Sequence, residues 1–169
     1  MKTLLRALPI LLLLVSAGAR GAGTFVQTPY PPAKAVFDVY LADPHEIDSA
    51  LYWVRSLFNT LTQAPYDYAP EDVHIVVILH GTEIVAVAKK NEAKYREAVG
   101  RMRYYADLGV KFLVCGQAAE DYGYSVRDFQ NFIEVVPNAI AELAYWQQRG
   151  YALITPRIYE RRLSIEQIR

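Results

Sequence analysis

The chain has 169 residues, of which 53% are hydrophobic and 21% charged, enough apolar material to bury the core of one domain. Its 18 basic residues balance 18 acidic ones, and no uninterrupted basic run is longer than Arg161-Arg162. The chain has too few clustered basic residues to form a surface that binds nucleic-acid phosphates, so we exclude nucleic acid as a partner. The composition also excludes a disordered or fibrous protein.

Residues 1–19 have the order of a secretory signal. Lys2 and Arg6 come first, the apolar stretch 8–15 follows, and the small residues 17–19 close the segment. The apolar stretch is too short for a membrane helix, which needs about 20 residues. We predict a cleavable signal peptide over 1–19, a periplasmic or secreted protein, and no membrane segment after cleavage. The alternative is an uncleaved amphipathic anchor.

Cys115 is the only cysteine. An exported chain with one cysteine has no internal disulfide to form in an oxidising compartment. Its stability must then come from packing, and the thiol is buried, paired with another chain, or kept for reaction.

The remaining chain alternates short apolar segments with segments of helical periodicity. Residues 20–33 contain two glycines and three prolines, which indicates a leader segment. Five strands are predicted at 34–41, 73–79, 110–115, 132–136 and 151–155, with helices after Asp43, after Asn91 and after Asn138 and a short helix or turn at 117–121. This alternation predicts a three-layer α/β/α sandwich with a five-stranded, mainly parallel sheet over residues 34–156. The tail 157–169 is either an amphipathic helix or arm, or a frayed terminus.

Three stretches of this domain resemble the DsrE/DsrF-like family, small α/β proteins of sulfur-relay systems and their exported relatives. They are VVILHGTEI (76–84), KYREAVGRMRYYADLGVKFLVCG (94–116) and VVPNAIAELAYWQQRGYALITP (135–156). The resemblance covers residues 34–156. It implies five parallel strands, assembly into dimers, trimers or hexamers, and in the relay members a cysteine that carries a persulfide sulfur. Cys115 falls where such a cysteine belongs.

Cys115 ends the third predicted strand, at the sheet edge where α/β folds keep their ligand sites. The amide of Gly116 and the next turn are expected to stabilise a thiolate there. His80 ends the neighbouring strand and is positioned to hydrogen-bond or deprotonate the thiol. The alternative for Cys115 is packing as a small hydrophobic residue, and for His80 a backbone hydrogen bond. We interpret His74 as structural and His45 as solvated.

The sequence predicts neither a metal site nor a cofactor. One cysteine and three histidines lie on separate elements without paired spacing. The GxGxxG and Walker patterns of nucleotide sites are absent, as is the GxSxG pattern of acyl hydrolases.

Two functions from different classes follow. In the first, the protein is a thiol sulfur carrier or sulfurtransferase component, with Cys115 and His80 as catalytic residues and a sulfur donor or acceptor protein as partner. In the second, it is a non-catalytic oligomeric module that binds a small ligand or a partner, with Cys115 structural. Both include a homo-oligomer, for which Tyr104, Tyr105, Tyr145 and Trp146 are candidate interface residues. The sequence leaves open whether the protein is an enzyme.

Overall fold

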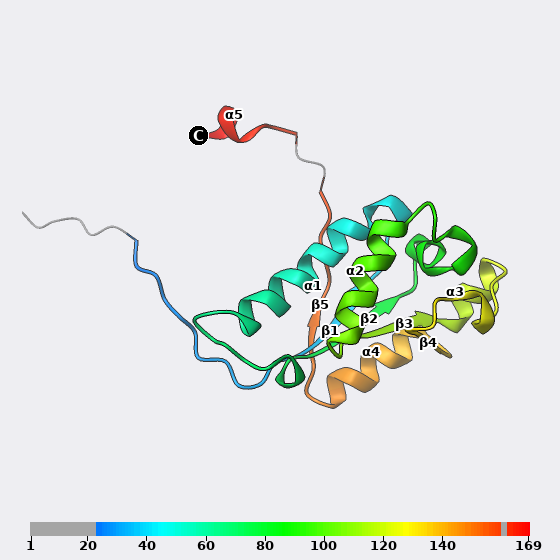
Figure 1. The fold of residues 1–169 in the computed structure, drawn as a ribbon, viewed down its shortest axis with the longest axis horizontal. Coiled ribbons are helices and arrows are strands. Elements are labelled where there is room, and N and C mark those ends of the chain that lie inside the picture. Colours follow the sequence, from blue (N-terminus) through cyan, green and yellow to red (C-terminus); the bar gives the residue numbers. More distant parts are fainter. Residues whose placement is uncertain (1–22, 160–161) are drawn as a thin grey trace, which may run out of the picture.

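The computed structural model describes residues 23–159 and 162–169. The predicted signal peptide, 1–19, lies outside the described residues. Residues 23–33 of the leader contain neither helix nor strand, and their first part projects away from the domain before the chain enters the first strand (Figure 1). Two tyrosines hold this leader: the hydroxyl of Tyr66 donates to the carbonyl of Thr28 at 2.6 Å, and Tyr68 donates to the carbonyl of Tyr30.

Five parallel strands form one sheet, in the order β4-β3-β2-β1-β5. The strands are β1 Lys34–Val39, β2 His74–Leu79, β3 Lys111–Cys115, β4 Ile133–Val136 and β5 Ala152–Ile154. The predicted five-stranded α/β architecture is confirmed, and every strand pair in the sheet is parallel. The last strand is shorter than predicted, since it pairs with β1 over only three residues.

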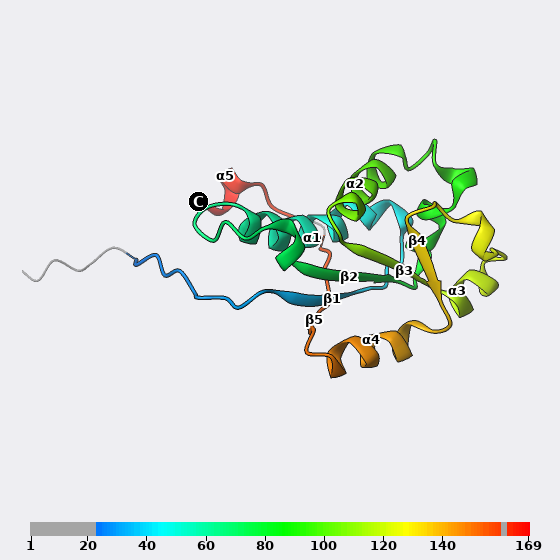
Figure 2. The same cartoon turned by 60° about the horizontal axis from the view of Figure 1, so that its bottom comes forward.

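Helices cover both faces of the sheet, as a three-layer fold requires. Helices α1 (Ile47–Thr62) and α2 (Arg96–Asp107) lie on one face, and α4 (Ala139–Gln148) lies on the other (Figure 2). The short helix α3 (Gly116–Asp121) follows β3 directly. Because β2 is covered on both sides, its residues after His74 are all buried, which explains their continuous apolar sequence.

Helix α1 forms where the sequence places one apolar stripe. The stripe residues Ile47, Ala50, Leu51, Val54, Phe58 and Leu61 are all buried. The side chain of Asp43 accepts the N–H of His45, and Pro44 opens a 3-10 turn that leads into the helix.

Helix α2 begins later than predicted, at Arg96 rather than after Asn91. The side-chain amide of Asn91 donates to the carbonyl of Val85 at 2.8 Å and to the hydroxyl of Tyr124 at 3.2 Å. It is thereby used to hold a neighbouring loop, and it caps no helix.

The tail forms one helical turn, α5 (Ile165–Ile168), with a capping box made by Ser164 and Gln167. Its apolar residues Leu163, Ile165 and Ile168 are exposed, and the turn lies away from the sheet in Figure 1. Among the described helices, none has both the length and the apolar character needed to span a bilayer.

Candidate functional site

Cys115 is the last residue of β3, at the carboxyl edge of the sheet. Its side chain belongs to the smaller core on the α4 face, together with Val36, Val76 and Ile78, and the residue is 5% exposed. The thiol sulfur accepts the backbone N–H of Ala139 at 3.3 Å. Ala139 is the first residue of α4, so the sulfur lies at the amino terminus of that helix.

This environment contains two opposing influences on the thiol. The first amides of a helix lack intrahelical partners and carry partial positive charge, which favours negative charge on a nearby sulfur. Burial among apolar side chains disfavours that charge. The amide that donates to the sulfur comes from α4. The sequence had predicted that it would come from Gly116. Gly116 has a steric role instead, because a Cβ there would lie 2.9 Å from the carbonyl oxygen of Val136.

His80 follows β2, and its ring forms an ion-pair contact with Asp38 of β1, Nε2 to Oδ1, at 2.7 Å. Strand alternation places Asp38 on the face of Val36, and His80, two residues after Ile78, on the same α4 face. The register pairs Leu79 with Val114, so the next positions, His80 just after β2 and Cys115 at the end of β3, lie at the same edge of the sheet.

Within the described residues the His80 ring bonds Asp38 and makes no hydrogen bond to the Cys115 thiol. The ring of Tyr40 packs at 5.0 Å from the imidazole. The structure therefore places Asp38, His80 and Cys115 on one face of the sheet. The expected hydrogen bond between His80 and the thiol is absent among the described residues, and His80 bonds to the Asp38 carboxylate instead.

Glu83 fixes the turn that carries His80. Its carboxylate is fully buried and accepts three backbone amides, from His80 at 2.7 Å, Gly81 at 2.8 Å and Leu41 at 2.9 Å. Desolvation raises the pKa of Glu83 above its ordinary value of 4.5, outweighing these hydrogen bonds. A Cβ at Gly81 would lie 2.6 Å from both the Glu83 carboxylate and the amide nitrogen of Leu41, so only glycine fits this turn.

The sequence-based reasoning missed Asp38, Glu83 and the Ala139 amide. The available signal was a charged residue inside an apolar segment, Asp38 in KAVFDVYL and Glu83 in TEIVAV. Such residues are rarely buried unless they are paired.

The other two histidines lie outside this group, as predicted. His45 is exposed and pairs with Asp43 at 2.7 Å, and His74 is exposed at the start of β2. Across residues 23–159 and 162–169, no three His, Cys, Asp or Glu side chains are arranged to hold a metal ion.

A cavity of about 520 Å³ opens beside the thiol at the carboxyl edge. Its lining includes Gly116, Tyr124, Val136 and Pro137. Cys115 itself is not part of the lining.

Comparison with known proteins agrees with this architecture. The model of the DsrE/DsrF-like family matches residues 34–156. A solved structure of a protein of unknown function, MTH1491 from Methanobacterium thermoautotrophicum, is similar with a TM-score of 0.59 and 20% sequence identity. The similarity covers 73% of this chain and 99% of that one, and it supports the shared fold. No curated protein shows significant similarity to the chain.

Proposed function

Because the chain belongs to the DsrE/DsrF-like family, we propose that it is an exported sulfur carrier or sulfurtransferase component that uses Cys115 as its persulfide site. The observation that carries the proposal is the hydrogen bond from the Ala139 amide to the Cys115 sulfur at 3.3 Å. An amide at a helix amino terminus stabilises the thiolate, the form of cysteine that attacks sulfur.

The proposed reaction needs no redox cofactor. The Cys115 thiolate attacks a sulfane sulfur of a donor such as inorganic polysulfide, forming a new S–S bond while one S–S bond of the donor breaks. The bond electrons leave with the shortened polysulfide. An acceptor thiolate then attacks the outer sulfur and releases the Cys115 thiolate. His80, held by Asp38 at the same edge of the sheet, is the proposed acceptor of the thiol proton, although its ring makes no direct hydrogen bond to the thiol.

A lone cysteine suits a carrier, because the chain has no second thiol that would convert the persulfide into an internal disulfide.

The test is the mass of the purified protein after incubation with polysulfide. We expect a gain of about 32 Da, reversed by a reductant, on the wild type and none on Cys115→Ser. The serine variant should stay folded, since its hydroxyl can also accept the Ala139 amide. An unmodified wild type under conditions that modify free cysteine would refute the carrier function.

A second candidate is a non-catalytic binding module in which Cys115 is structural. The specific observation in its favour is the 5% exposure of Cys115 within the smaller core. Labelling with a thiol reagent at neutral pH separates the two functions. The carrier should label in its folded form, whereas a structural thiol should label only after denaturation.

Export and assembly are part of the proposal. The order of charged, apolar and small residues in 1–19 supports a mature amino terminus near Arg20, which amino-terminal sequencing of exported protein would locate.

Members of the family commonly form oligomers and act with partner proteins. Of the predicted interface residues, Tyr104 and Tyr145 are exposed and support a homo-oligomer here, whereas Tyr105 is buried in the core. Light scattering would measure it, and deletion of 157–169 would show whether the tail contributes.

A further inference from the structure

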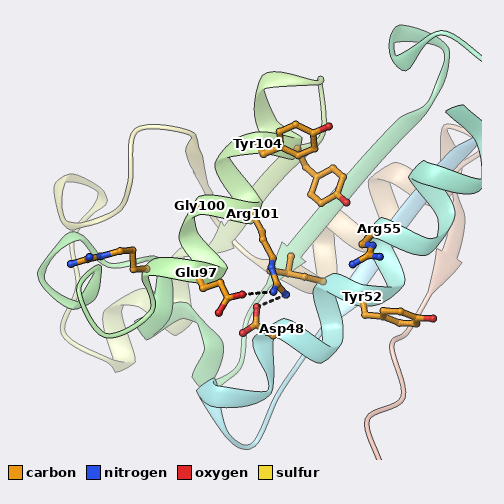
Figure 3. A pocket seen from close by; sticks show the side chains of 10 residues that line it. Asp48, Tyr52, Arg55, Glu97, Gly100, Arg101 and Tyr104 are labelled. Carbon is orange, nitrogen blue, oxygen red and sulfur yellow. Dashed lines mark hydrogen bonds and ion pairs between the residues drawn. The ribbon is translucent and has the colours of Figure 1, made fainter. Parts of the chain in front are cut away.

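A second cavity, of about 570 Å³, lies between α1 and α2, on the face of the sheet opposite Cys115 (Figure 3). This volume falls in the range of sites for small organic ligands. The cavity shares no lining residue with the cavity beside the thiol.

The ionised side chains of this cavity leave positive charge unmatched. Arg101 binds two carboxylates, Asp48 at 3.2 Å and Glu97 at 2.6 Å, as the dashed lines of Figure 3 show. Arg55 and Arg96 also line the cavity, and neither makes an ion pair within the described part of the chain. Three arginines against two carboxylates leave one net positive charge, which suits a monoanion better than a dianion.

Arg55 is the arginine directed into the cavity. Figure 3 shows it extending from α1 into the space between the helices. Burial raises the pKa of the Tyr105 phenol. The positive charge of Arg55 is the largest of the influences that lower this pKa. Both residues line the cavity, Arg55 from α1 and Tyr105 from the facing helix α2.

Tyrosine rings make the apolar side of the cavity. Tyr104 and Tyr105 pack edge to face with centroids 5.3 Å apart. No hydrogen bond of either hydroxyl to another described residue is present, so both remain available to a ligand. A flat apolar body laid against these rings would gain burial and aromatic contact.

Gly100 keeps the α2 side of the cavity open. A Cβ at this position would meet no atom within 4 Å, so the helix has no steric need for glycine. Glycine inside a helix costs about 1 kcal/mol relative to alanine. The site thus retains open space at the expense of helix stability.

We propose that this cavity binds a small organic carboxylate, held by the Arg55 guanidinium through its charged group and by Tyr104 and Tyr105 through its apolar body. The guanidinium presents a planar fork of donors that matches a carboxylate in two parallel hydrogen bonds. This binding is independent of the sulfur chemistry proposed for Cys115.

The test is an NMR titration of the ¹⁵N-labelled protein with benzoate, with benzamide and acetate as paired probes. Benzamide keeps the ring without the charge, and acetate keeps the charge without the ring. We expect saturable shifts of the amides in α1 and α2 with benzoate, and binding about tenfold weaker or worse with the other two.

Variants assign the binding to the cavity. Arg55→Gln should weaken benzoate about tenfold or more, and Gly100→Ala should weaken it by filling space while the helix is retained. The matched control is Arg149→Gln, which removes another exposed arginine, on the α4 side, and should leave the affinity unchanged. Absence of saturable shifts, equal affinity for benzamide, or an unchanged affinity in Arg55→Gln would each overturn the proposal.

Discussion

The backbone amide of Ala139 donates its hydrogen to the sulfur of Cys115 across 3.3 Å, although the two residues are 24 positions apart in the chain. The contact joins the carboxyl end of β3 to the amino terminus of α4, and it passes over the Pro137-Asn138 junction that ends β4. The proposed reactivity of the thiol therefore depends on how α4 begins.

Substitution of Ala139 by proline tests this dependence directly. Proline is well tolerated as the first residue of a helix and removes the N–H that the sulfur accepts; its Cδ then points toward the sulfur, so the sulfur and the helix terminus must also move apart. The preceding residue, Asn138, already has the extended conformation that proline requires, with φ −154° and ψ 132°. We expect alkylation of Cys115 at neutral pH to slow about tenfold, since a hydrogen bond to a charged group contributes roughly 1.5–3 kcal/mol.

Asn138→Ala is the control for that variant. It removes the side-chain cap that accepts the Ala141 amide at 2.9 Å, costing about 1 kcal/mol of stability, and leaves the bond to sulfur in place. Circular dichroism should show both variants folded. Equal alkylation rates for Ala139→Pro and wild type would mean that the amide does not activate the thiol.

Substitution of Asp38 by asparagine tests the pair formed with His80. The amide keeps the shape of the side chain but loses the charge that orients the imidazole. We expect the rate of persulfide formation from polysulfide to fall about tenfold or more, with an unchanged fold. Stopped-flow measurement of the rate from pH 5 to 9 would show this.

The chain contains a matched control in Asp43, which pairs with His45 at the same 2.7 Å but on the exposed surface. Asp43→Asn should leave the rate unchanged. If both variants behave alike, Asp38 has no role at the thiol.

Much of the fold was predictable because its signals are local. The apolar stripe of α1 and the continuous apolarity of β2 each follow from periodicity within a few residues of sequence. The start of α2 was predicted wrongly because Asn91 makes its bonds to Val85 and Tyr124, contacts that no local rule contains.

The site was predictable only in part for the same reason. The edge position of Cys115 and His80 follows from strand ends, which the sequence marks. The residues that bond to this edge do not follow from local sequence. The contact of Asp38 with His80 spans 42 positions of the chain, and the contact of Leu41 with Glu83 also spans 42. Parallel strands are joined by a long crossover connection, so residues that meet at their ends are far apart in the sequence. No fixed sequence spacing therefore predicts which side chains pair across the two strands.

Substitution of Glu83 by glutamine should destabilise the protein by about 1–3 kcal/mol, since the new NH₂ group faces a backbone N–H and leaves a buried donor unpaired. The loss should depend on pH. Because the pKa of Glu83 is raised above 4.5 in the folded state, its stabilising contribution is complete below pH 4.5 and declines as pH rises through the raised value.

The stability difference between wild type and Glu83→Gln should therefore be larger near pH 4.5 than at pH 7, as measured by urea unfolding. The exposed Glu120→Gln serves as control and should show a small difference at both pH values. A difference that grows with pH would contradict the raised pKa.

Substitution of Gly116 by alanine links packing at the edge of the sheet to the thiol. The added Cβ would lie 2.9 Å from the Val136 carbonyl oxygen and 3.4 Å from that of Pro137, both backbone atoms that cannot swing aside. The end of β4 must shift, at a cost of about 1–3 kcal/mol. Since α4 begins directly after this segment, the Ala139 amide should move relative to the sulfur. Both the rate of Cys115 alkylation and the unfolding midpoint should therefore change.

Gly100→Ala is the opposite case in the same protein, a helical glycine whose Cβ meets nothing within 4 Å, and it should raise stability by roughly 0.5–1 kcal/mol without affecting the thiol. Urea unfolding and alkylation measured on both variants would reveal the contrast, and a Gly116→Ala protein as stable and as reactive as wild type would show that the contact with β4 is not tight.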